Sequence, residues 1–140
     1  MIRKFQEKDI DEVMNLWLNT NIQAHNFIDD YYWKNNFQVV KGLIPQAEVY
    51  IYEKNGEILG FAGVAENYIA GIFVKAEYQS CGIGNKILKH LKEIYSELTL
   101  KVYEKNSRAV NFYQRENFKI EAEDIDEAVN EKEFFMKWKK

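Results

Sequence analysis

QSCGIG, residues 79–84, stands between an apolar run, YIAGIFV (68–74), and a helical pattern, NKILKHLKEIY (85–95). Its two glycines are one residue apart, where a strand would give way to a helix. Glycine has no Cβ, so its backbone N–H can approach a ligand closely. The start of a helix adds unpaired N–H groups and a partial positive charge. The stretch therefore predicts an anion site, most often for phosphate, unless it is only a tight turn.

The bulk composition predicts one domain, 1–140, because 140 residues with 46% hydrophobic and 15% aromatic side chains can build a core. A net charge of −3 argues against a nucleic-acid partner. The lone cysteine, Cys81, is typical of a reducing, cytoplasmic protein. No apolar stretch reaches the roughly 18 residues of a membrane span, so no membrane contact is expected. Cys81, His25 and His90 lack the spacing of metal ligands, so no metal is expected.

The order of predicted elements is β-α-α-β-β-β-α-β-α-β-β, an α/β domain with a mixed, α+β sheet. Asn-Gly between two strand-like runs predicts a hairpin at residues 54–57. The acidic segment 121–133 is interpreted as a solvated loop, or alternatively as a lure for a basic substrate. The expected strands are Ile2–Phe5, Val49–Glu53, Ile58–Ala65, Tyr68–Val74, Leu98–Tyr103, Phe118–Glu121 and Glu133–Trp138, and the expected helices follow Asp9 and cover Ile28–Val40, 85–95 and Ser107–Glu116.

Two common phosphate motifs fail on the glycine stretch. A Walker loop needs Gly-x-x-x-x-Gly-Lys-Ser/Thr, which the chain lacks. A dinucleotide fingerprint needs a third glycine or alanine where this chain has Ile87, and it commonly follows the first strand. Neither a nucleotide-hydrolysing site nor a dinucleotide site is therefore expected.

A third pattern fits both the glycine stretch and a second segment. Q-x-x-G-x-G (79–84) opens a helix after an apolar strand, and N-x-x-A-x-x-F-Y (106–113) follows one strand later, with Phe118 beyond it. This pair resembles the signature motifs of the GCN5-related N-acetyltransferase (GNAT) superfamily, as does the whole element order. Asn117 stands where that family has glycine, and asparagine tolerates a positive φ well. The segment LWLNTNIQAHNFIDDYYW (16–33) is similar to the small bacterial YiaC/YjaB-like branch.

The resemblance implies an acetyl-CoA cosubstrate in the cleft between the central strands. Backbone N–H groups of the glycine stretch would face the pyrophosphate. The extended pantetheine arm would pair with a strand edge, where the N–H of Ile72 would donate to the thioester oxygen. The implied cofactor-binding residues are Ile72, Phe73, Val74, Gln79, Ser80, Cys81, Gly82, Ile83, Gly84, Asn85 and Asn106, with Gln79 supporting the loop and Asn106 also able to cap a helix.

The same resemblance places a general acid at Tyr113, because a phenol is protonated at neutral pH and can donate to the leaving thiolate. Glu66 is a candidate base acting through a water. His25, Tyr31 and Tyr68 are candidates for the acceptor site, although aromatic residues on a helix are more often core. Cys81 has no recognisable His and carboxylate partners, so a covalent step is not expected.

The predicted activity is N-acetyl transfer to a primary amine by direct attack. The acceptor could be a protein lysine, a protein N-terminus or a small metabolite, and the branch likeness favours lysine. The alternative is a non-catalytic coenzyme A-binding regulatory module, which would not need Tyr113. An enzyme acting on charged tRNA is disfavoured by the net charge of −3. The protein could be a monomer or a homodimer.

Overall fold

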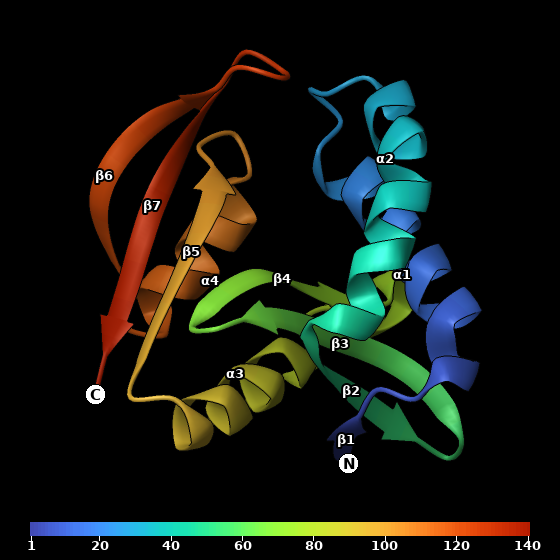
Figure 1. Ribbon diagram of the computed structural model, residues 1–140. Helices are drawn as coiled ribbons and strands as arrows, with labels where there is room; N and C mark the ends of the chain where they lie inside the picture. Colours follow the sequence, from blue (N-terminus) through green and yellow to red (C-terminus); the bar gives the residue numbers. More distant parts are fainter.

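The computed structural model describes all 140 residues as one seven-stranded sheet with helices on both faces (Figure 1). The strand order is β1-β2-β3-β4-β5-β7-β6, and the predicted order of elements is confirmed. No helix is long and apolar enough to cross a membrane. The strands are β1 (Ile2–Lys4), β2 (Glu48–Lys54), β3 (Glu57–Ala65), β4 (Tyr68–Val74), β5 (Glu97–Tyr103), β6 (Lys119–Asp126) and β7 (Glu131–Lys139), and the helices are α1 (Ile10–Ala24), α2 (Asp30–Leu43), α3 (Ile83–Ile94) and α4 (Ser107–Arg115).

The β2–β3 hairpin turns where the sequence predicts it. Asn55 and Gly56 have φ values of 53° and 77°, which is the left-handed backbone that a tight two-residue hairpin turn requires. The helical period of α3 places Ile87, Leu88 and Leu91 on its buried side. Both predictions follow from local chemistry, so they do not depend on distant parts of the chain.

Two hydrophobic cores lie on opposite faces of the sheet. Helices α3 and α4 pack on one face, with Leu88, Leu98 and Met136 in the larger core cluster. Helices α1 and α2 pack on the other face, over a smaller cluster around Met14 and Phe61. Side chains alternate between the faces along each strand, so β4 contributes to both cores.

Strands β4 and β5 are parallel and pair over only two positions, Tyr68 with Thr99 and Ile69 with Leu100. Beyond these pairs β5 continues beside β7 as far as Tyr103, while β4 continues beside β3 as far as Val74. The edge of β4 that faces β5 therefore has no strand partner over 70–74. A register shift between Gly63 and Val64 accompanies this separation, because a bulge bends and twists a strand locally.

The interpretation of residues 121–133 as a loop is wrong. Strand β6 runs as far as Asp126 and pairs antiparallel with β7, which begins at Glu131. The sequence did not indicate the length of this strand, because β6 is an edge strand with nearly every residue exposed. Charged side chains are a usual feature of such edges, since they oppose pairing with another chain. Lys132 bridges Glu104 and Glu123 across this ribbon.

Candidate active site

The two glycines of QSCGIG differ in backbone conformation and in surroundings. Gly82 is the N-cap of α3 and has φ 84° and ψ 5°, a left-handed conformation that favours glycine. A Cβ at Gly82 would meet nothing within 4 Å, so the backbone angle and not the space selects glycine. A Cβ at Gly84 would lie 3.4 Å from the ring of Phe112, an ordinary van der Waals contact, so an alanine would fit between α3 and α4 there. No side chain caps α3, which leaves its first N–H groups free for an anion.

A network of side chains holds this loop in place. Gln79 Nε2 donates to the carbonyl of Val74 at 3.0 Å. Arg108 on α4 donates to Gln79 Oε1 at 2.7 Å and to Ser80 Oγ at 2.8 Å. The role expected for Gln79 was support of the loop, and these contacts agree with it. Sequence reasoning missed Arg108, although its place two residues after Asn106 in the second motif was a usable signal.

The remaining loop residues offer backbone more than side chain. Ile83 is buried in the larger core, whereas Cys81 is exposed and free. Asn85 turns its amide away from the loop and donates to the carboxylate of Glu116 at 2.9 and 3.0 Å. An anion at this position would therefore meet backbone N–H groups, as expected of a pyrophosphate cradle, with the Arg108 guanidinium beside the loop.

Strand β4 presents its backbone where the three residues expected to hold pantetheine lie. Ile72 and Val74 pack against the α3–α4 core. Phe73 points to the opposite face, where it stacks on Phe61 at 4.8 Å between ring centroids. The side chains thus anchor the strand on both faces, and the edge next to β5 stays unpaired.

Tyr113 lies on α4, on the face of the sheet that carries the larger core. It is 7% exposed and packs on Phe112 and Phe118. Its hydroxyl makes no hydrogen bond within the protein, yet it is not among the fully buried unpaired atoms, which are His25 Nδ1 and Trp33 Nε1. Burial raises the pKa of Tyr113, and the charge of Tyr68 raises it further. The phenol is therefore protonated at neutral pH and able to donate a proton.

Asn106 and His25 contact each other, with Asn106 Nδ2 and His25 Nε2 3.1 Å apart. Asn106 Oδ1 also accepts from Ala109 N at 3.2 Å, so Asn106 caps α4 as expected. His25 stacks on Trp33 at 5.2 Å between ring centroids, and burial lowers the pKa of His25 to about 4. Asn106, expected at the cofactor, and His25, expected at the acceptor, therefore connect the start of α4 with the end of α1.

The other acceptor-side candidates are spread out. Tyr68 lies on β4, and burial raises its pKa, helped by the charge of Glu133 and opposed by the backbone amide of Lys101. Tyr31 is 66% exposed on α2. Glu66 lies in the exposed β3–β4 turn with φ 58° and makes no hydrogen bond or ion pair. Tyr68 is partly buried, whereas Tyr31 and Glu66 lie on the surface.

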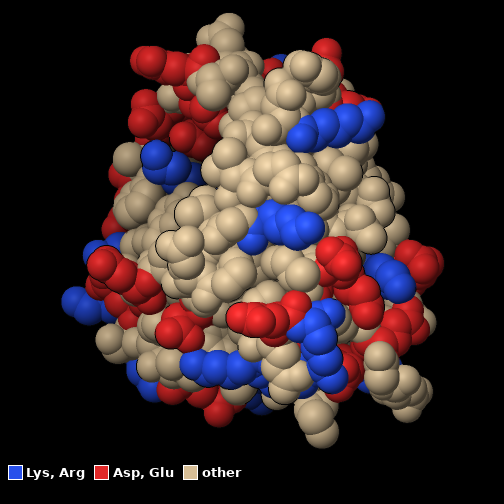
Figure 2. Space-filling model, turned by 45° about the vertical axis from the view of Figure 1, so that its right-hand side comes forward, with Lys and Arg blue, Asp and Glu red and all other residues tan.

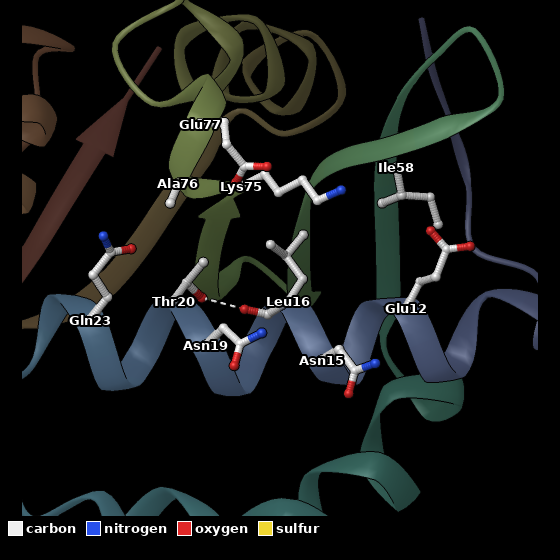
Figure 3. Close-up of a pocket in the computed structure, with 10 residues that line it drawn as sticks. All are labelled: Glu12, Asn15, Leu16, Asn19, Thr20, Gln23, Ile58, Lys75, Ala76 and Glu77. Atoms are coloured by element: carbon white, nitrogen blue, oxygen red, sulfur yellow. Dashed lines mark hydrogen bonds between the residues drawn. The ribbon is translucent and has the colours of Figure 1, made fainter.

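One cavity is a groove of about 450 Å³ between α1 and the chain that follows β4 (Figure 3). Asn15, Asn19 and Gln23 line it from successive turns of α1, and Lys75 and Glu77 line the other side. Sequence reasoning did not find this groove. It contains neither Tyr113 nor Tyr68, so it is not where the expected chemistry lies.

Comparisons with known proteins give a family and a fold. Residues 45–120 match the Acetyltransferase (GNAT) domain. The chain is 32% identical over 122 residues to the peptidyl-lysine N-acetyltransferase YiaC of Escherichia coli K12, covering 86% of this chain and 84% of YiaC. It is 24% identical over 120 residues to the peptidyl-lysine N-acetyltransferase YjaB of the same strain, covering 85% of this chain and 82% of YjaB.

Solved structures share the fold at low sequence identity. The solution structure of apo YjaB from Escherichia coli matches with a TM-score of 0.87 at 21% identity, covering 99% of this chain and 96% of that one. The acetyltransferase YncA from Salmonella typhimurium, solved with its cofactor acetyl-CoA, matches with a TM-score of 0.70 at 15% identity, covering 99% and 92%.

Proposed function

This chain belongs to the GNAT family of acetyltransferases, as an acetyl-CoA-dependent N-acetyltransferase, and on that premise we propose that its acceptor is a lysine side chain of a protein. The resemblance drawn from the two motifs is confirmed. One observation supports the cosubstrate site: the edge of β4 that faces β5 is unpaired over 70–74, and the chain then leads to the QSCGIG loop at the start of α3. An extended thioester substrate can lie along that edge, with its phosphates at α3 and its acetyl group near the phenol.

The cosubstrate would be held mostly by backbone groups. The N–H groups from about Cys81 to Asn85 would bind the pyrophosphate, and the β4 backbone from Ile72 to Val74 would pair with the pantetheine amides. Asn106 would reach the coenzyme only by exchanging its contact with His25. Gln79 and Ser80 act through the shape of the loop, because Arg108 already holds their side chains.

Acetyl-CoA supplies a thioester carbonyl, and the protein's groups act around it. A backbone N–H of β4, assigned to Ile72, would stabilise the negative charge that grows on the carbonyl oxygen. Tyr113 would donate its proton to the leaving thiolate. Direct attack by the amine is supported by Cys81, which is exposed and makes no hydrogen bond that would activate it as a nucleophile.

The acceptor side supports a cationic substrate. Figure 2 shows acidic side chains gathered at the upper left of the molecule, over the β6–β7 hairpin. The acceptor group of lysine is an ammonium at neutral pH, so an acidic approach would attract a lysine-bearing segment. The relatives YiaC and YjaB, both named peptidyl-lysine N-acetyltransferases, support the same acceptor class.

The test measures release of the free thiol of coenzyme A with three acceptor classes: lysine peptides with a blocked N-terminus, peptides with a free N-terminus and no lysine, and polyamines. We expect the lysine peptides to be used best. Preference for either other class would overturn the lysine assignment. Binding of acetyl-CoA without turnover on any acceptor would instead favour the coenzyme A-binding module.

A further inference from the structure

One carboxylate on the acceptor face of the sheet, that of Glu133, has no ion-pair partner closer than 3.7 Å. Glu133 pairs in register with Tyr103 across β5 and β7, so both side chains point to the same face. That is the α1–α2 face, because Tyr103 packs against the smaller core, whereas Val102 and Phe134, which alternate with them, pack in the larger one. Asp124 pairs with Glu133 from β6 and shares this face.

Glu133 differs from the carboxylates around it. Asp126 accepts from the Tyr103 hydroxyl at 2.7 Å and from Ala128 N at 3.1 Å. Glu131 forms an ion pair with Lys105 at 3.1 Å. The side chain of Glu133 is only 13% exposed, yet its nearest charge partner is Lys101 at 3.7 Å, and it accepts no hydrogen bond within ordinary range. A half-hidden carboxylate without a close donor can receive one from a ligand.

The position of Glu133 connects it to the opening between β4 and β5. After burial, the negative charge of Glu133 contributes to the raised pKa of Tyr68. Tyr68 is the first residue of β4 that pairs with β5. The pKa of Tyr113 is raised by burial and, when Tyr68 is ionised, by the charge of Tyr68. Tyr113 is on α4, which packs on the opposite face of the sheet. An amine held by Glu133 would enter the opening between β4 and β5 from the α1–α2 face, opposite the face on which Tyr113 packs.

Aromatic side chains complete the surroundings of Glu133. Burial raises the pKa of Tyr32 on α2, and the charges of Asp126 and Glu133 raise it further. Tyr103 closes the β5 side and contacts His25 and Phe27 from the α1–α2 loop. A lysine side chain suits such walls, because its methylene stem packs on aromatic rings while its ammonium reaches a carboxylate.

We propose that Glu133 is the carboxylate that holds the acceptor's ammonium group and takes its proton before the amine attacks. This role rests on the proposed function, and it gives the proton a destination other than the surface residue Glu66. Burial raises the pKa of Glu133 from its ordinary value, which makes it a stronger base than an exposed glutamate.

The step balances with these groups. The ammonium gives one proton to Glu133, and the freed lone pair forms the N–C bond to the thioester carbonyl carbon. The C–S bond then breaks, and the thiolate takes the hydroxyl proton of Tyr113. The nitrogen loses its second proton, which restores the Tyr113 hydroxyl, and Glu133 releases the first proton to solvent. The products are the acetylated amine, coenzyme A as a thiol and one proton.

The rate should follow the ionisation of Glu133, which must be deprotonated to act. Activity is then absent at low pH and rises as Glu133 ionises, at a pH above the ordinary value of 4.5. Neighbouring groups can shift the pH at which Glu133 ionises. The titratable and charged groups that face it are Tyr32 on α2, Tyr68 on β4, Lys101 and Tyr103 on β5, and Asp124 and Asp126 on β6.

The experiment compares Glu133→Gln with Glu131→Gln in the full chain, using a lysine peptide with a blocked N-terminus. Glu131 is the matched control, because it lies two residues away on the same strand with a side chain 14% exposed. We expect Glu133→Gln to lower kcat/KM by about 10²-fold or more and to lose the acid limb of the pH profile. Glu131→Gln should stay within about threefold, since it removes one surface ion pair. Acetyl-CoA binding should be unchanged in both.

The outcomes separate this role from the proposed function. Loss in Glu66→Gln while Glu133→Gln stays active assigns the proton to Glu66 and overturns the proposal. If the native protein acetylates no amine, the proposed function fails. Titration of Nα-acetyl-lysine amide into the coenzyme A-loaded protein then decides whether Glu133 holds the ammonium: equal binding to native and Glu133→Gln overturns it. If Glu133→Gln does not fold, Glu133→Asp, which keeps the charge but withdraws it, should lose most of the activity, and full activity overturns the proposal.

Discussion

The proposed cofactor side and the proposed acceptor side of this molecule are built by different means. The cofactor side uses backbone: the β4 edge, the QSCGIG loop and the start of α3 follow one another along the chain. The acceptor side uses side chains from separate elements, with Tyr32 on α2, Tyr68 on β4, Tyr103 on β5 and Glu133 on β7. A site made of backbone groups is formed by residues that are contiguous in the sequence. A site made of side chains from separate elements forms only when the chain folds. The first can serve many relatives unchanged, and the second can change its acceptor by single substitutions.

The largest expected effect comes from Tyr113, the residue at which the two sides meet. Tyr113→Phe removes one hydroxyl and should lower kcat by about 10²- to 10⁴-fold, because the thiolate loses its proton donor. Acetyl-CoA binding, measured by calorimetry, should not change. Tyr95→Phe is the control, since Tyr95 packs on the same core but its hydroxyl lies beside that of Tyr50. An unchanged kcat in Tyr113→Phe would remove the phenol from the chemistry.

The next effect concerns the His25–Asn106 contact between the two sides. The pKa of His25 falls from 6.5 to about 4 on folding, so the unfolded chain binds more protons across this window. The stabilisation is complete above pH 6.5 and is lost as pH falls to about 4, at a cost of at most about 3 kcal/mol. Urea unfolding of the native protein and His25→Phe at several pH values should show a flatter pH dependence in the variant. Parallel curves would mean that His25 titrates normally in the folded protein.

Two glycines test whether the cofactor loop depends on backbone conformation. Gly82→Ala should cost about 1–2 kcal/mol, because an alanine resists the left-handed φ of 84° although its Cβ has room. Gly42→Ala is the matched control: a Cβ there also meets nothing within 4 Å, and α2 is right-handed. It should stabilise the protein by about 0.4–1 kcal/mol. Chemical denaturation measures both, and equal signs would contradict the conformational argument.

The smallest effect is expected from the brace on the cofactor loop. Arg108→Met removes the bonds to Gln79 and Ser80. Because these bonds are exposed, their loss should raise the KM for acetyl-CoA by about fivefold, with kcat within about twofold. Arg115→Met on the same helix removes an equal charge without a hydrogen-bonded partner and should leave both constants unchanged. A fall in kcat alone would instead place Arg108 near the reacting atoms.

The same contrast explains what the sequence could predict. The cofactor loop, the N-cap at Asn106 and the position of Tyr113 on a helix rest on short-range patterns, and the structure has the glycine turn before α3 and the cap and Tyr113 on α4. The Asn106–His25 contact joins residues 81 positions apart, and no local pattern encodes such a pair. Glu133 looked like one more charge in an acidic run, because the pairing of β6 with β7 that half-buries it is a tertiary feature. The extension of β6 beyond Glu121 was missed for the same reason.

The most direct test of the account uses one peptide that carries both a free α-amino group and a single internal lysine. It is incubated with acetyl-CoA and the native protein, and tandem mass spectrometry locates the acetyl group. The account predicts acetyl on the lysine Nζ, with the α-amino group left free. Acetyl on the α-amino group alone, or an unmodified peptide although acetyl-CoA binds, would contradict it.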